Sequence, residues 1–188
     1  VDLLDGDWRH AVDPERLEAR LTEDRGHRIC AVLVVHNETS TGVTSRLPQI
    51  RDAIDQAGHP ALLLVDAVSS LGSIDLRHDE WGIDVTLAGS QKGLMLPPGL
   101  GFNAISAKAL AASRAARLPR SYFSWEQMLT PNASGFFPYT PATNLLFGLR
   151  EALAMLEEEG LSNVFERHQR LAAAARAAVT AWQLDIAC

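Results

Sequence analysis

Three polar residues follow apolar runs of the sequence and have the chemistry of a reactive site. Thr39 comes after the first run, Asp66 stands directly after the second, and Lys92 follows the third. A carboxylate beside an apolar run is costly to desolvate, so we expect a cationic group to face Asp66. A lysine held among apolar residues loses its proton more readily and can act as an amine nucleophile. These residue types predict a site in which a carboxylate and an amine act together.

Each of these residues also has a structural explanation. An Asp at a strand end commonly caps a turn, a loop lysine is commonly solvated, and Lys92 could serve only as an ion-pair partner of Asp66. His36, at the end of the first run, is interpreted as a satisfied strand-end histidine in preference to a base. A phosphate-binding P-loop is excluded for 89–93, because this segment lacks the Gly-rich lead and the Ser or Thr after the lysine.

The elements that must position these residues are strands alternating with helices. Apolar runs without polar alternation are typical of strands buried on both faces of a sheet, and four of them lie at 29–35, 61–65, 83–88 and 100–105. Helical spacing or a helix cap marks 14–24, 47–57 and the segment after Ser106. The sequence therefore predicts an α/β fold with a mostly parallel sheet flanked by helices. In such sheets ligands bind at the carboxyl edge, where Thr39, Asp66 and Lys92 would meet.

The C-terminal part of the chain differs in composition. Segment 119–141 carries four prolines and several aromatic residues, which predicts a long ordered loop. Leucines at helical spacing follow up to Gly160, and a second helical stripe runs from Leu161 to Trp182. We expect this last helix to leave the sheet domain, so that 1–160 form one domain and 161–188 begin a smaller one.

Composition excludes several classes of function. The formal charge of −6 and a pI near 5.5 provide no clustered basic surface for nucleic acid or anionic membrane. No apolar stretch reaches the length of a membrane span. Cys30 and Cys188 form neither a disulfide framework nor a metal-ligand spacing. We expect a cytoplasmic protein with small-molecule partners, no metal, no nucleic acid and no membrane contact.

Four segments of the sequence, in their order along the chain, resemble the class V aminotransferases. These are pyridoxal-phosphate enzymes of fold type I. The segments are His36–Val43, Leu64–Gly72, Gly89–Gly99 and Phe136–Leu146, and Asp66 and Lys92 stand 26 positions apart. Within the family the likeness is greatest to the enzymes that transfer the amino group of serine or alanine to glyoxylate. The resemblance implies the large domain of that fold and an aminotransferase activity that uses pyridoxal 5'-phosphate.

The resemblance also implies roles for individual residues. Lys92 would be the catalytic residue that bonds the cofactor and moves a proton between substrate and cofactor, and Asp66 would pair with the pyridine nitrogen. Thr39 would bond the phenolic oxygen, Val68 would pack on the ring, and Gln91 would contact the phosphate. Thr140 would reach the phosphate of the neighbouring subunit in a homodimer; its alternative role is to cap a helix that begins near Ala142.

Some parts of the family pattern have no counterpart in this sequence. The upstream phosphate cradle and ring-stacking aromatic would precede Val1, and the arginine that binds the substrate carboxylate would lie beyond Cys188. Phe137 takes the place of a family tyrosine. We therefore expect a middle portion of a longer catalytic chain. The alternatives are a pyridoxal-phosphate lyase or desulfurase of the same fold, which Gln91 in place of a histidine disfavours, and a non-catalytic fragment.

Overall fold

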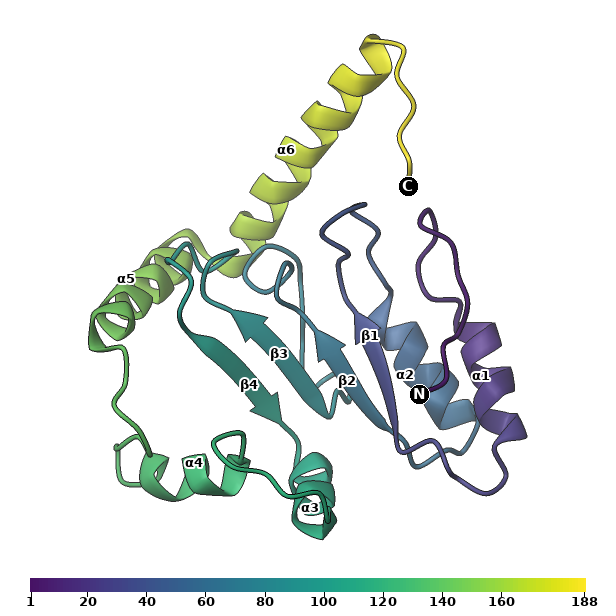
Figure 1. Cartoon of the computed structure of the whole chain (residues 1–188). Coiled ribbons are helices and arrows are strands. Elements are labelled where there is room, and N and C mark those ends of the chain that lie inside the picture. Colours follow the sequence, from purple (N-terminus) through teal and green to yellow (C-terminus); the bar gives the residue numbers. More distant parts are fainter.

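The computed structural model describes all 188 residues (Figure 1). In chain order the elements are α1 (Pro14–Glu23), β1 (Ala31–Val35), α2 (Leu47–Gln56), β2 (Leu62–Asp66), β3 (Val85–Gly89), β4 (Gly101–Ile105), α3 (Ala107–Ala115), α4 (Trp125–Asn132), α5 (Thr143–Glu159) and α6 (Leu161–Ala181). Local chemistry sets several of these bounds. Asp13 caps α1 by accepting from the amides of Glu15 and Arg16, and Ser106 caps α3 by accepting from that of Ala109.

The four strands form one sheet in the order β1-β2-β3-β4. β1, β2 and β3 are parallel, with Val35 opposite Asp66 and Asp66 opposite Leu87, whereas β4 runs antiparallel to β3. The connection from β3 to β4 is too short for a parallel crossover, which needs a dozen or more residues. The prediction of a mostly parallel α/β sheet is confirmed.

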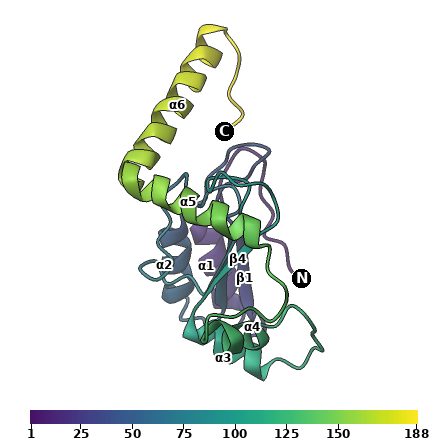
Figure 2. The ribbon, with the colours of Figure 1, turned by 90° about the vertical axis from the view of Figure 1, so that its left-hand side faces the viewer.

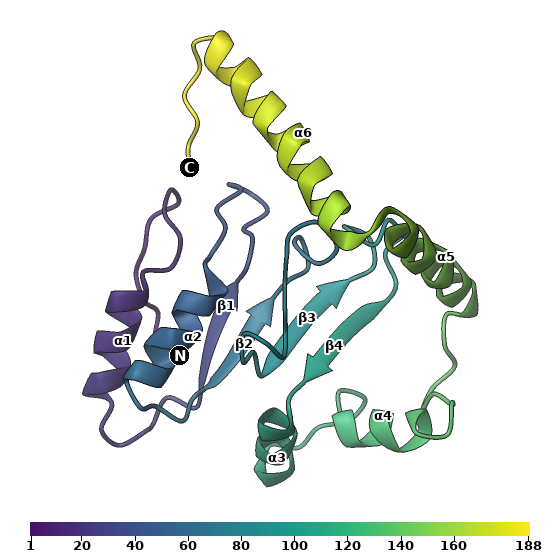
Figure 3. The same cartoon turned by 180° about the vertical axis from the view of Figure 1, so that it is seen from behind.

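One face of the sheet carries the main core. α1 and α2 lie against this face, as the views from the front and from behind both show (Figures 1 and 3). Their buried side chains meet those of β1 and β2 in a single cluster that includes Leu17, Leu21, Val34, Leu47, Ile50, Ile54, Leu63 and Val65. Burial of these side chains stabilises the sheet from one side only.

The opposite face of the sheet is open in this chain, so the prediction that the strands are buried on both faces is wrong. Leu33 is 75% exposed, Val35 and Leu87 are also exposed, and Val34 between the first two is buried. Burial therefore alternates along β2 and along the second half of β1, although both sequences are apolar up to Asp66. Side chains point to the two faces in turn, and no helix layer of these 188 residues covers the second face of β1 and β2.

α5 and α6 build a second, smaller core beside the sheet. Leu94 and Leu96, from the loop after β3, pack against Ala152 and Leu156 of α5 and Val164 of α6. α6 then extends away from the sheet (Figure 2), and Arg167 bonds Glu159 in a two-pronged ion pair across the α5–α6 junction. The division into domains 1–160 and 161–188 stays a prediction. No helix of the chain combines the length and the apolarity needed to cross a bilayer.

Segment 119–141 is not a continuous loop, because α4 lies within it. The prediction rested on the four prolines and the aromatic residues of this segment, and one of these prolines, Pro131, lies inside α4. Pro131 stands next to the last residue of this eight-residue helix, so the missing proline amide costs only one bond near the helix end. Trp125, the first residue of α4, donates from Nε1 to Asn103 of β4, which attaches the segment to the edge of the sheet.

A buried carboxylate joins the strands at the edge opposite their carboxyl ends. Asp84, just before β3, is 4% exposed and accepts hydrogen bonds from the Leu63 amide at 2.9 Å and the Ser106 hydroxyl at 2.7 Å. Lys108 Nζ lies 3.7 Å and Arg51 Nη1 4.0 Å from the same carboxylate oxygen. Asp84 thus connects β2, β3, α2 and the start of α3, and nothing in the sequence pattern distinguished it.

We expect Asp84→Asn to lower the free energy of unfolding by about 1.5–3 kcal/mol, the usual worth of hydrogen bonds to a charged group. The amide keeps the shape of the side chain but removes the charge that faces Lys108 and Arg51. Urea unfolding followed by circular dichroism measures the change. Asp79→Asn, at an exposed position without side-chain hydrogen bonds, is the control, and equal stability of the two variants would contradict the role given to Asp84.

Candidate functional site

The carboxyl ends of β1, β2 and β3 meet at one edge of the sheet, the upper edge in Figure 1. The backbone continues the pairing past the strands: His36 donates from its amide to the Asp66 carbonyl at 2.9 Å, and Ala67 donates to the Leu87 carbonyl at 2.8 Å. The loops that follow the three strands are therefore neighbours. These loops and the end of β2 carry five of the six predicted site residues, which are Thr39, Asp66, Val68, Gln91 and Lys92.

The loop after β1 folds back on itself and exposes Thr39. Glu38 donates from its amide to the Val43 carbonyl at 2.9 Å, and Gly42 donates to the Glu38 carbonyl at 2.8 Å. The Glu38 carboxylate accepts from the side chain and amide of Ser40, and these bonds lower the pKa of Glu38. The hydroxyl of Thr39 makes no hydrogen bond within the protein, so it is available to a ligand.

Asp66, the last residue of β2, is exposed and has no cation beside it. Its Oδ1 accepts from the Val68 amide at 2.9 Å, which turns the chain after the strand and fixes the carboxylate. The expectation of a facing cation from the chain itself is wrong, because the open face of the sheet leaves Asp66 hydrated. The interpretation of Lys92 as its structural ion-pair partner is wrong for the same reason. Asp66 presents an unpaired negative charge at the edge.

The loop after β3 is closed by one buried hydroxyl. Ser90 donates from Oγ to the Pro97 carbonyl at 2.8 Å and accepts from the Leu100 amide at 3.2 Å. Its own carbonyl accepts from the Leu96 amide at 3.1 Å. These bonds hold the two ends of the loop together and leave the segment that contains Lys92 at the surface.

Lys92 stands at the surface of this loop, and its amine makes no hydrogen bond or ion pair within the chain. Gly93, next in sequence, has no room for a side chain, because a Cβ there would lie 2.1 Å from the Leu71 carbonyl oxygen. This close approach seats the Lys92 turn on the loop after β2. Gln91 folds its side chain back over Gly89, on the same edge.

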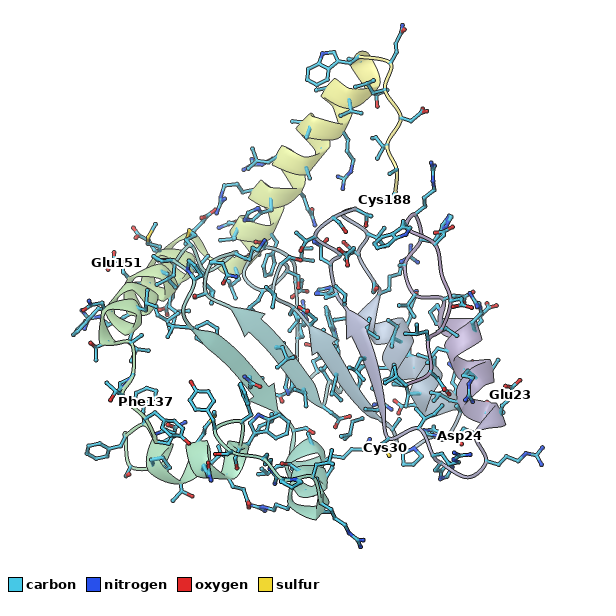
Figure 4. The ribbon with its side chains drawn as sticks, in the orientation of Figure 1. Glu23, Asp24, Cys30, Phe137, Glu151 and Cys188 are labelled. Carbon is cyan, nitrogen blue, oxygen red and sulfur yellow. The ribbon has the colours of Figure 1, made fainter.

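Thr140 is not brought to this edge within the chain. It lies in the connection from α4 to α5, and the labelled Phe137 of the same connection is far from the ends of β1–β3 (Figure 4). Ala142 is the N-cap of α5 and no side chain caps that helix, so the capping role of Thr140 is not observed. Thr140 instead lines an open hollow of about 910 Å³ with aromatic and proline residues: Tyr122, Phe136, Phe137, Pro138, Tyr139 and Pro141.

Two side-chain contacts between the loops were missed by sequence reasoning. His36 Nδ1 lies 2.9 Å from Ser70 Oγ, and Asn37 Nδ2 donates to Ser69 Oγ at 3.1 Å. Burial disfavours the charged imidazole and lowers the pKa of His36, so this ring is neutral at neutral pH. The interpretation of His36 as a satisfied strand-end histidine is confirmed, but its partner is 34 residues away and has no signal in a single sequence.

The arrangement has a definite chemical capacity. A free carboxylate, a free amine and a free hydroxyl stand on adjacent loops, and none of them is neutralised by the rest of the chain. A carboxylate in this state stabilises a ligand cation, and an unpaired amine can add to a carbonyl carbon. The edge is therefore suited to a ligand that carries both a cationic nitrogen and an electrophilic carbonyl.

Known proteins are similar to this chain in both sequence and architecture. The chain is 56% identical to a serine–glyoxylate aminotransferase of Methylorubrum extorquens and 50% identical to an L-aspartate–glyoxylate aminotransferase of Paracoccus denitrificans. The alignments cover 98% and 99% of this chain but 47% of each relative, so the chain spans about half the length of these proteins.

A solved structure agrees with the sequence comparison. The pyridoxamine–pyruvate aminotransferase of Mesorhizobium loti superposes with a TM-score of 0.84 at 33% identity, over 93% of this chain and 44% of that one. The family profile of class V aminotransferases matches residues 2–184. The resemblance carried by the four sequence segments is confirmed by these matches, and the chain belongs to the class V aminotransferase family.

Proposed function

We propose that the protein is a pyridoxal-phosphate-dependent aminotransferase that moves the amino group of serine or alanine to glyoxylate or a similar 2-oxo acid. The observation that carries the proposal is that the unpaired Asp66 carboxylate and the unpaired Lys92 amine stand past the ends of two neighbouring parallel strands, on the carboxyl edge of the sheet. The reaction exchanges an amino group for a carbonyl oxygen between two acids, so it needs no external oxidant or reductant. Its relatives in the family act on glyoxylate with serine or aspartate as donor.

The residues present fit pyridoxal phosphate. A carboxylate that has no cation of its own complements a protonated ring nitrogen, and Asp66 is such a group. When bound, the cofactor supplies an electron sink for the electrons released at the substrate α-carbon. Asp66 would keep the ring nitrogen protonated, and Lys92 would hold the cofactor through Nζ and carry the proton released from the substrate α-carbon.

The remaining proposed contacts orient the cofactor. Thr39, with its free hydroxyl, donates to the phenolic oxygen of the ring, and half-buried Val68 packs on the ring face. Gln91 contacts the phosphate from the loop after β3. Contacts from three loops would restrict the rotation of a flat ring and so help to orient it toward Lys92.

The lysine assignment is tested in the full-length protein with Lys92→Ala. We expect loss of the visible absorbance of bound cofactor and a fall in transamination of at least about 10³-fold, since no other group of the site offers an amine. The chain contains only one other lysine, Lys108, whose Nζ donates to the Ala61 carbonyl at the far edge of the sheet. Lys108→Ala is therefore the control. Transamination that survives in Lys92→Ala but not in Lys108→Ala would refute the assignment.

Asp66→Asn keeps the side-chain shape and removes the charge that would hold the ring nitrogen protonated. We expect turnover to fall by about 10²–10³-fold, the scale for loss of one strong electrostatic contact in an active site. Thermal stability should change little, because Asp66 is exposed and an amide oxygen can still accept from the Val68 amide. Initial rates with serine, alanine and aspartate as donors measure the effect and also rank the donors. Near-normal turnover with any of them would show that Asp66 does not serve the cofactor.

We further propose that the protein is a homodimer in which Thr140 contacts the cofactor phosphate of the partner subunit. Thr140 is remote from its own site edge, and its neighbours Phe136, Phe137 and Tyr139 are exposed apolar groups of the kind that associate. Pro138 and Pro141 restrict the backbone on both sides of it. The Thr140 hydroxyl is exposed, stands on a restricted backbone and does not cap α5. It is therefore suited to contact a ligand bound in another subunit.

Mixed dimers of Lys92→Ala and Thr140→Ala subunits test this sharing. If Thr140 acts in the partner's site, one site of the mixed dimer carries both defects and the other is intact, so activity returns to about half of that of the unmodified dimer. If Thr140 acts within its own subunit, each site carries one defect. The two parent homodimers are the controls, and a mixed dimer no more active than the parents would exclude the shared site.

A further inference from the structure

Two pairs of neighbouring residues join the loop after β1 to the loop after β2. His36 Nδ1 lies 2.9 Å from Ser70 Oγ. Asn37 Nδ2 donates to Ser69 Oγ at 3.1 Å, and Ser69 Oγ donates to the Asn37 carbonyl at 2.5 Å. We call these four residues the cross-loop clasp. The clasp runs between the Thr39 loop and the segment that begins at Asp66.

The inner contact of the clasp is buried and neutral. His36 is 3% exposed, Ser70 is fully buried, and Trp81 stands edge-on to the imidazole with ring centroids 6.4 Å apart. A buried hydroxyl that loses its partner destabilises the fold, so the pair holds its geometry. Because it is neutral, it adds no charge that would compete with Asp66 at the same edge.

The clasp fixes the segment between Asp66 and Ser70 at both ends. The His36 amide donates to the Asp66 carbonyl, and the His36 ring contacts the Ser70 side chain. Between these points the Asp66 carboxylate accepts from the Val68 amide, and the Ser70 amide donates to the Ala67 carbonyl. The amide and the ring of His36 therefore contact both ends of the segment that carries the Asp66 carboxylate and Val68.

The other side of the clasp fixes the loop that holds Thr39. Asn37 Oδ1 accepts from Thr44 Oγ1 at 3.0 Å, and the His36 carbonyl accepts from the Ser45 amide at 2.8 Å. Both contacts close the base of this loop, with Thr39 at its exposed tip. One pair of adjacent residues, His36 and Asn37, is thus bonded to both structures that carry the proposed ring contacts.

We infer that His36 and Ser70 are positioning residues that hold the Thr39 loop and the Asp66 segment in the relative position that cofactor binding requires. This inference rests on the proposed function. Neither side chain touches the reacting atoms; they act through the loops that they join. Loss of the inner contact would let the two loops separate, and the cofactor would lose simultaneous contact with Thr39 and Asp66.

The chain contains a matched control for this pair. His78 Nδ1 lies 2.8 Å from Oγ1 of Thr86, the buried second residue of β3. The chemistry is again imidazole to hydroxyl, but the contact joins the turn before β3 to the strand itself and touches none of the site loops. Removal of either hydroxyl should therefore cost similar stability, while only that of Ser70 should affect the cofactor.

The experiment uses the full-length holoenzyme and compares Ser70→Ala with Thr86→Val. The readouts are the dissociation constant for pyridoxal phosphate, the pH midpoint of the absorbance change of the bound cofactor, and the melting temperature of each apoenzyme. We expect Ser70→Ala to weaken cofactor binding by about tenfold and to shift the absorbance midpoint, as loss of one positioned hydrogen bond predicts. Thr86→Val should lower the melting temperature with both cofactor readouts unchanged.

A rescue pair extends the test to the histidine. His36→Asn retains an amide near the position of Nδ1, whereas His36→Ala does not, so the Asn variant should bind the cofactor more tightly than the Ala variant. Where Ser70→Ala does not fold, Ser69→Ala removes the outer, half-buried contact, and we expect a smaller loss in the same direction. Equal cofactor binding by Asn and Ala at position 36 would overturn the inference.

The outcomes separate the inference from the proposed function. If the unmodified full-length protein binds no pyridoxal phosphate, the proposed function fails and the inference with it. If it binds the cofactor, and Ser70→Ala matches Thr86→Val in dissociation constant and absorbance midpoint, the inference alone is overturned. Weaker cofactor binding and a shifted absorbance midpoint in the clasp variants alone support the inference.

Discussion

The parallel hydrogen bonding of β1, β2 and β3 is the constraint on which the rest of the structure depends. Parallel strands end at the same edge, so residues separated by more than 20 positions in sequence come to adjacent loops. The register places Val35, Asp66 and Leu87 side by side. The three loops start at or just after this row of residues. β4 runs the other way because the loop that carries Lys92 joins the end of β3 to the start of β4 at this same edge.

The carboxylates at the two edges of the sheet differ in burial and in charge pairing. Asp84 is buried and satisfied by hydrogen-bond donors and two cations, which makes it a structural joint. Asp66 is exposed, accepts one amide and leaves its charge unmatched. An unmatched charge contributes little to folding but is available to a ligand, and the open face of the sheet makes this possible.

The contacts that join the loops of the candidate site to one another are between neutral groups, and the Thr39 hydroxyl, the Asp66 carboxylate and the Lys92 amine are left free. Ser90 closes the Lys92 loop, Gly93 seats it against Leu71, and the clasp through His36 joins the two remaining loops. These contacts fix the backbone without neutralising Asp66 or Lys92. Rigid loops that carry unpaired reactive groups are the arrangement expected of a preorganised site.

The sequence by itself determined the strands, most helix bounds, the mostly parallel sheet and the edge shared by Thr39, Asp66 and Lys92, because apolar runs and caps are local signals. Some of its predictions were wrong: no cationic group of the chain lies beside Asp66, and α4 occupies a segment predicted as a loop. Only the tertiary structure decided which carboxylate is buried and that His36 meets Ser70. Burial and long-range partners depend on how distant segments pack, and a single sequence carries no local signal for that.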